Sequence, residues 1–185
     1  PPSLFVDNLL EGEEREMVIY GEDIVANTSR YFGPHGSVAA ITNGMNCQNC
    51  HLEAGTKFWG NNYGGVAANY PKYRERSGTI ETIYKRINDC LERSLNGKAL
   101  DSNSHEMQAM QAYIIWIGRN VPLKKKPVGS AIADLPYLDR AADPIKGKQV
   151  YRIKCQSCHT PEGTGILNKE GNGYIYPPLW GENSY

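Results

Sequence analysis

Two short stretches of the chain carry the residue types and spacing that could do chemistry, residues 47–51 and 155–159. Each has two cysteines separated by two residues and a histidine directly after. At this spacing the thiols can form thioether bonds to a porphyrin and the histidine can bind its iron, which is typical of c-type haem. A Cys-x-x-Cys pair is also found in zinc and redox sites, but no further pair is present to complete a zinc site. We therefore expect two covalently bound haem c groups, attached through Cys47, Cys50, Cys155 and Cys158, with His51 and His159 as iron ligands.

A fifth cysteine, Cys90, has no partner for an internal disulfide once the four haem cysteines are used. In an oxidising compartment a lone thiol is a liability unless it is buried, bound to a metal or chemically employed. Two interpretations stay open, an inert buried thiol and a second axial ligand for the iron held by His51. The rival ligands are His35, His105, Met45 and Met110.

Residues 78–95 are predicted to form one helix, because apolar residues recur at helical spacing from Ile80 to Leu95. Cys90 would lie on the buried edge of this helix. Arg86 and Ser94 lie one turn to either side of it, so the three share one strip of helix surface. Arg86 and Arg93 would both favour the thiolate of Cys90 by their charge.

The remaining pattern indicates a mainly α protein. Helices are predicted over residues 11–30, 104–119 and from Pro144 into the second motif, and residues 53–71 read as an aromatic-rich loop covering haem. We expect two cytochrome c-like haem domains, residues 1–125 and 143–185, joined by a linker over residues 126–142. The lysine run at 124–126 fits a solvated linker or a docking patch for an acidic redox partner.

The second haem domain is predicted to be incomplete at its C-terminal end. The segment after His159 contains no methionine and no helical pattern. A small haem c unit needs a distal-ligand loop and a closing helix, and neither is visible there.

Composition excludes some functions. Lysine plus arginine and aspartate plus glutamate both total 20, so the balance gives no electrostatic signature of nucleic-acid binding. The longest strongly apolar run, around residues 113–117, is far shorter than the ~20 residues of a membrane span. The N-terminus has no export signal and reads as a mature form. Because haem c is attached outside the bacterial cytoplasm, we expect a periplasmic protein.

Residues 84–97 carry a specific resemblance, together with Asn-Cys-His-Leu at 49–52 and Pro-Pro-Leu-Trp-Gly at 177–181. They resemble the dihaem thiosulfate dehydrogenase and tetrathionate reductase family. The resemblance implies coupling of two thiosulfate ions to tetrathionate with release of two electrons, or the reverse. It also implies that a small c-type cytochrome or similar protein exchanges the electrons.

The same resemblance implies roles for single residues. Cys90 would be the second axial ligand opposite His51 at the catalytic haem, and the haem at His159 would relay electrons. The family brings a methionine or lysine to that second haem from a later segment, and Lys169 is a poor substitute. The implied catalytic set is Cys90, Arg86, Ser94, Arg76 and Arg93.

Two other functions fit the same motifs. A haem-thiolate subunit of a sulfur-oxidising multienzyme complex also has a cysteine ligand, but there the reactive cysteine usually accompanies the later haem. A plain dihaem electron carrier would need no fifth cysteine and would show methionine ligands after each motif.

Overall fold

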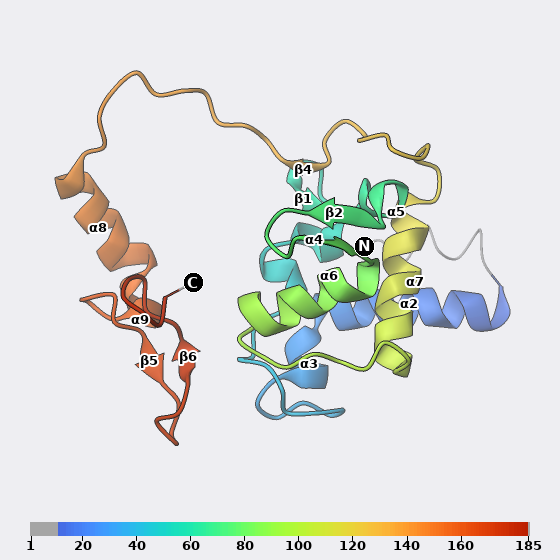
Figure 1. The fold of residues 1–185 in the computed structure, drawn as a ribbon, viewed down its shortest axis with the longest axis horizontal. Helices are drawn as coiled ribbons and strands as arrows, with labels where there is room; N and C mark the ends of the chain where they lie inside the picture. Colours follow the sequence, from blue (N-terminus) through green and yellow to red (C-terminus); the bar gives the residue numbers. More distant parts are fainter. Residues whose placement is uncertain (1–10, 185) are drawn as a thin grey trace. The chain divides into compact units, whose positions relative to one another are not determined.

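A computed structural model describes residues 11–184, which form two compact units. The first unit runs through Asp134 and the second begins at Leu135. Each unit contains helices and short two-stranded antiparallel ribbons (Figure 1). The division falls inside the stretch, residues 126–142, that the sequence predicts as a linker.

The core of the first unit forms where α2 (Gly12–Ala26) packs against α7 (His105–Gly118). Gly21 makes this close crossing possible, because a Cβ atom there would lie 2.0 Å from the carbonyl oxygen of Ala109. Around the crossing the side chains are almost completely shielded from solvent. They include Val18, Ile24, Phe32, Met107, Met110 and Tyr113.

The helix predicted over residues 11–30 is broken at Asn27 into α2 and α3 (Thr28–Phe32). The hydroxyl of Thr28 donates to the carbonyl of Ile24 at 2.9 Å and accepts from the backbone N–H of Cys47, also at 2.9 Å. The break therefore fixes the start of the first haem motif against the helix that precedes it.

The prediction of a single helix over residues 78–95 is wrong at both ends. Its start is a strand, β3 (Thr79–Glu81), paired with β2 (Lys72–Arg74), and Ile80 is therefore 72% exposed instead of lying on a core stripe. The helix α6 (Ile83–Asp89) begins only where the Thr82 side chain accepts from the N–H of Lys85. Its last turn widens into a π-helix, η2 (Cys90–Ser94).

Short elements complete the first unit: η1 (Cys47–Asn49), α4 (Leu52–Gly55), β1 (Gly60–Asn62), α5 (Val66–Asn69) and β4 (Ala131–Ile132). Helix α7 agrees with the prediction over 104–119, and the Ser104 side chain caps it by accepting from Met107 N–H. Strand β4 pairs with β1, so the first unit continues past the expected boundary at residue 125.

The second unit contains α8 (Pro144–Lys154), α9 (Gln156–His159), β5 (Ile166–Leu167) and β6 (Tyr174–Tyr176). The prediction that a helix opens at Pro144 is confirmed. Its cap is Asp143, whose carboxylate accepts from the N–H groups of Ile145 and Lys146. Strands β5 and β6 then form an antiparallel ribbon after the second motif.

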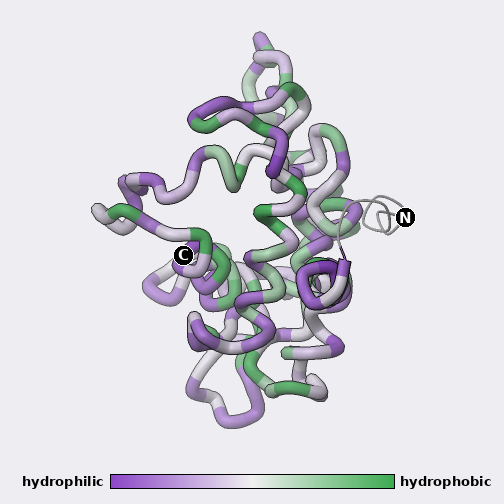
Figure 2. The backbone as a smooth tube through the Cα atoms, turned by 90° about the vertical axis from the view of Figure 1, so that its right-hand side faces the viewer, coloured by the Kyte–Doolittle hydropathy of each residue, from purple (hydrophilic) through white to green (hydrophobic). Residues whose placement is uncertain are grey.

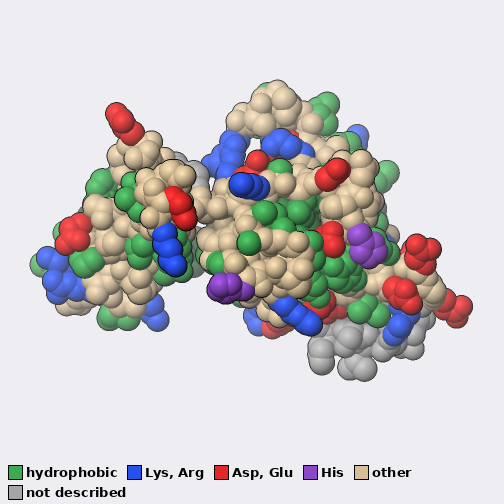
Figure 3. All heavy atoms as spheres, turned by 90° about the horizontal axis from the view of Figure 1, so that it is seen from below, with side chains coloured by type: hydrophobic (Ala, Val, Ile, Leu, Met, Phe, Trp, Pro, Cys, Tyr) green, Lys and Arg blue, Asp and Glu red, His purple; other side chains and the backbone are tan. Residues whose placement is uncertain are grey.

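Hydrophobic and hydrophilic segments alternate along the chain (Figure 2). Within residues 11–184 no helix is both long and apolar enough to cross a membrane. Basic and acidic side chains are interspersed on the face shown in Figure 3, as the equal totals of the two signs lead one to expect.

Candidate functional site

The first haem motif lies on one wall of a cavity in the first unit. Cys47, Cys50 and His51 all line this cavity. Nδ1 of His51 lies 2.6 Å from the carbonyl oxygen of Asn61, and the ring packs against Tyr63 with centroids 4.5 Å apart. If Nδ1 carries the proton it donates to that carbonyl, and Nε2 is left as the ligand atom.

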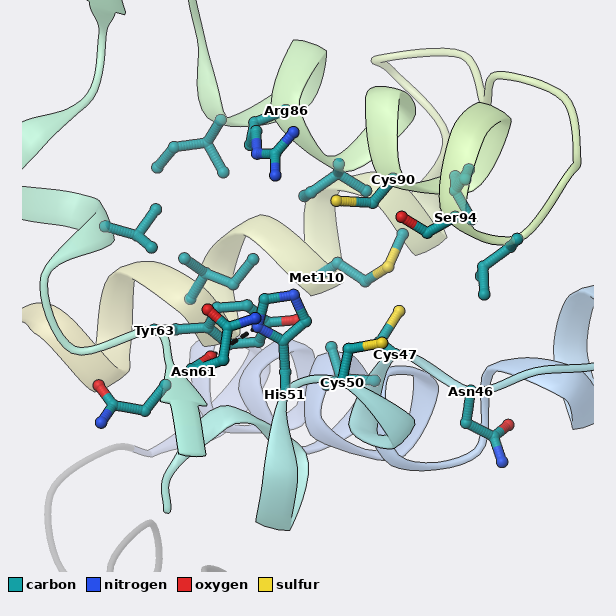
Figure 4. A pocket seen from close by; sticks show the side chains of 18 of the residues that line it. Asn46, Cys47, Cys50, His51, Asn61, Tyr63, Arg86, Cys90, Ser94 and Met110 are labelled. Atoms are coloured by element: carbon teal, nitrogen blue, oxygen red, sulfur yellow. Dashed lines mark hydrogen bonds between the residues drawn. The ribbon is translucent and has the colours of Figure 1, made fainter. Parts of the chain in front are cut away.

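The opposite wall is formed by α6 and η2, which carry Arg86, Cys90 and Ser94. Figure 4 shows the Cys90 sulfur pointing into the cavity from the side facing His51, with Arg86 and Ser94 to either side of it. The π-helical turn begins at Cys90 itself. Such turns are rare and occur frequently at functional sites, because the extra residue re-aims the side chains around it.

Burial governs the electrostatics of the protein groups that face the cavity. It raises the pKa of the Cys90 thiol, the charge of Arg86 offsets this only in part, and Asp89 adds to the rise. The expectation that neighbouring arginines favour the thiolate therefore holds for Arg86, but burial outweighs it. Burial also lowers the pKa of His51, which keeps its imidazole neutral, the form that binds metals.

The residues present fit a covalently attached haem. Two thiols and an oriented imidazole stand on one wall, a sulfur faces them, and the rest of the lining is largely apolar, as a porphyrin requires. The apolar side chains are Val25, Val66, Ile83, Ile87, Leu91, Leu95, Met110 and Ile114.

The structure separates the rival ligands. His35 and His105 are exposed, and His105 stacks on Tyr20 instead of facing the cavity. Met45 does not line the cavity, whereas Met110 does and is fully buried. Cys90 and Met110 are therefore the two sulfur atoms, besides those of the motif, that reach this site within the described chain.

Two members of the predicted catalytic set do not reach the cavity. Arg76 is exposed in the turn between β2 and β3, and Arg93 is exposed on η2. Arg86, Cys90 and Ser94 are the three that the structure brings together. Asn61 was missed, because a backbone carbonyl leaves no signature in the sequence. Tyr63 belongs to the aromatic-rich loop over residues 53–71 that was expected to cover haem, and it lines the cavity.

The second motif has the same local design in its own unit. Nδ1 of His159 lies 2.9 Å from the carbonyl oxygen of Pro177, and the hydroxyl of Tyr151 donates to the carbonyl of Thr160 at 2.6 Å. Trp180 covers Gly163 so closely that a Cβ atom there would lie 2.2 Å from the indole ring. The carbonyl of Pro177 thus faces His159 as the carbonyl of Asn61 faces His51.

Comparison with known proteins finds relatives of this chain. Residues 37–123 match the SoxA/TsdA cytochrome c domain family. The chain is 35% identical to a thiosulfate dehydrogenase of Stutzerimonas stutzeri, over 92% of the chain and 53% of that protein. It is 39% identical to one of Psychrobacter arcticus, over 78% and 44%, and 34% identical to one of Allochromatium vinosum, over 96% and 64%.

A solved structure of thiosulfate dehydrogenase (TsdBA) from Marichromatium purpuratum has the same fold, with a TM-score of 0.70 and 28% identity. The match covers 97% of this chain and 38% of that one. Along most of its length the chain is similar to thiosulfate dehydrogenases. It spans about half the length of the curated relatives it matches. Its cytochrome c domain accordingly binds haem c covalently.

Proposed function

We propose that the chain is the catalytic part of a dihaem oxidoreductase that couples two thiosulfate ions to tetrathionate, or performs the reverse reduction. The observation that carries this proposal is the position of Cys90, which faces His51 across the cavity between Arg86 and Ser94. A cysteine in that position is unnecessary for a plain electron carrier. The relatives named thiosulfate dehydrogenase support the same activity.

Arg86 would offset the negative charge of the substrate. Two thiosulfate dianions repel each other, and this repulsion grows in a partly dry cavity because the effective dielectric constant falls. A guanidinium can bind sulfonate oxygens through charge-assisted, often bidentate hydrogen bonds. Arg86 would therefore hold one dianion beside the Cys90 sulfur, and the Ser94 hydroxyl can donate a further hydrogen bond.

Cys90 divides the reaction into two steps, as covalent catalysis does in general. In the first, the Cys90 thiolate and the terminal sulfur of one thiosulfate form an S–S bond, giving Cys90–S–S–SO₃⁻ and releasing two electrons. In the second, another thiosulfate attacks the outer sulfur of this disulfide, so tetrathionate leaves and the Cys90 thiolate returns. Charge and atoms balance in both steps.

Two haem groups, one at each motif, would accept the two electrons, one each. The match of both histidine environments supports a group at each site. We place the protein in the periplasm, where haem c is attached and a small c-type cytochrome could take the electrons. This location rests on the haem motifs alone.

Replacing Cys90 tests the proposal. Cys90→Gly should abolish thiosulfate oxidation and tetrathionate reduction while both haems stay attached, because the attachment thiols are untouched. It should also remove the long-wavelength charge-transfer band of a thiolate-ligated ferric haem. Met110→Leu, which conserves volume at the rival sulfur, should keep both the band and the activity. Full activity in Cys90→Gly would contradict the proposal.

The assay also separates the alternatives. Steady-state rates are measured with thiosulfate plus an electron acceptor, and with tetrathionate plus a donor. A plain electron carrier would show neither rate. A haem-thiolate subunit of a sulfur-oxidising complex would act only together with its partner subunit.

A further inference from the structure

A second hollow lies beside the haem cavity in the first unit and carries three positive side chains. Lys72 and Arg74 come from β2, and Lys126 comes from the stretch that the sequence predicted as linker. No aspartate or glutamate lines it. We call it the basic hollow.

The basic hollow adjoins the haem cavity, because the two share part of their lining. Asn61, Asn62, Val66 and Tyr70 line both. An anion in the basic hollow would therefore lie next to the sulfur chemistry and not on a remote surface.

Hydrogen bonds to backbone carbonyls fix the wall that carries Lys126. The N–H of Lys124 donates to the carbonyl of Ala68 at 2.7 Å, and Nδ2 of Asn69 donates to the carbonyl of Lys125 at 2.8 Å. On the far side of Lys126, Nδ2 of Asn62 donates to the carbonyl of Gly129 at 2.6 Å. Lys126 is thus held against the hollow although its neighbours in the lysine run, Lys124 and Lys125, do not line it.

A buried carboxylate holds Arg74. Glu81 is 3% exposed, and its Oε2 lies 3.9 Å from Nε of Arg74. At this distance the contact is an ion pair without a hydrogen bond, and Oε2 of Glu81 has no hydrogen-bond partner among the described residues. Glu81 cancels part of the positive charge, but Lys72 and Lys126 keep the hollow cationic.

The chemistry of the proposed reaction requires a second anion site. Two dianions must meet, yet Arg86 is the one arginine or lysine among the described residues that line the haem cavity. We infer that the basic hollow binds the sulfonate group of the second thiosulfate, which is also one end of tetrathionate, through Arg74 and Lys126. This inference rests on the function proposed above. The propionates of a bound haem would be another source of anionic oxygens.

Binding of tetrathionate tests the inference without turnover. The oxidised holoprotein, with no electron donor, is titrated with tetrathionate in a calorimeter. Lys126→Gln and Arg74→Gln should each weaken binding by about 10-fold, as expected for loss of one charge-assisted hydrogen bond. Lys125→Gln, which removes the same charge from the same run, should bind as the wild type does, and added salt should reduce the difference.

Three outcomes decide the matter. Equal affinity of wild type and both variants would overturn the inference, even if thiosulfate turnover is normal. A shifted haem reduction potential in Lys126→Gln with unchanged tetrathionate affinity would assign the hollow to the propionates and overturn it as well. In the third outcome the wild type shows no turnover, yet the variants bind tetrathionate more weakly than it does. That result would support the basic hollow as an anion site and contradict the proposed function.

Discussion

At the scale of single residues, Tyr113 supports the wall that carries His51. Its side chain is completely buried, and its hydroxyl donates to the carbonyl oxygen of Ala54 at 3.0 Å. Ala54 follows His51 by three residues and has a φ of 53°, a conformation that an alanine rarely adopts. The hydrogen bond therefore secures an unfavourable turn directly behind His51.

Tyr113→Phe should destabilise the first unit by about 1–3 kcal/mol, because it leaves the buried carbonyl of Ala54 without its donor. Urea unfolding of the holoprotein, followed by circular dichroism, measures this change. Tyr137→Phe makes the same substitution at a side chain that is 92% exposed and should leave the unfolding curve unchanged. Equal stability of both variants would contradict this role for Tyr113.

Sequence reasoning identified some site residues and could not identify others, for physical reasons. Arg86, Cys90 and Ser94 are close in the chain, so helical spacing alone predicts that they share a face. Asn61 acts through a backbone carbonyl, which every residue possesses. Arg74 and Lys126 are brought together by tertiary hydrogen bonds across many intervening residues, and no local pattern records such pairing.

At the scale of elements, the crossing of α2 and α7 is the contact on which the haem cavity rests. The floor of the cavity includes Val25 from α2 and Met110 and Ile114 from α7. Gly21 at the crossing lets the two backbones approach closely. The distance between α2 and α7 therefore sets the width of the cavity beside the first haem motif. Packed interiors tolerate little added volume at such a contact.

Gly21→Ala and Gly147→Ala should have opposite effects on stability. At Gly21 the new methyl group would meet the backbone of Ala109, so we expect destabilisation by about 1–3 kcal/mol or more. At Gly147 in α8 nothing lies within 4 Å, and alanine should stabilise the helix by about 0.5–1 kcal/mol. Thermal unfolding compares the two variants. A neutral Gly21→Ala would show that the helices can move apart freely.

The sequence predicts elements well where capping residues mark them. Ser104 and Asp143 with Pro144 identify the starts of α7 and α8. It fails for β3 and for the π-helix at Cys90. Ile80 continues a helical spacing by coincidence, while pairing with β2 decides its conformation. A π-turn depends on the contacts of the helix end, which periodicity does not contain.

At the scale of the whole molecule, the chain places one haem motif in each of two compact units. Residues 133–142 span the boundary between the two units and are exposed throughout. Exposed connecting segments with few contacts are the preferred sites of proteolysis. Arg140 lies in this stretch and offers a cleavage site to trypsin.

Brief trypsin treatment of the holoprotein should therefore cut first after Arg140. The products should be two fragments that both retain covalently bound haem, detected by mass spectrometry and by haem staining of a denaturing gel. Arg140→Gln should slow this first cut. A fragment ending after Arg140 that carries all of the haem would show that the second motif is not loaded.

Asn61 takes part in both cavities: its carbonyl faces His51, and the residue also lines the basic hollow. Binding equilibria that share a structural element are reciprocal, so an effect of iron charge on anion affinity implies an equal effect of the anion on reduction. An anion binds more tightly to the more positive, oxidised form. Occupation of the basic hollow would thus lower the midpoint potential of the adjacent haem, so that the supply of anions itself biases the direction of electron flow.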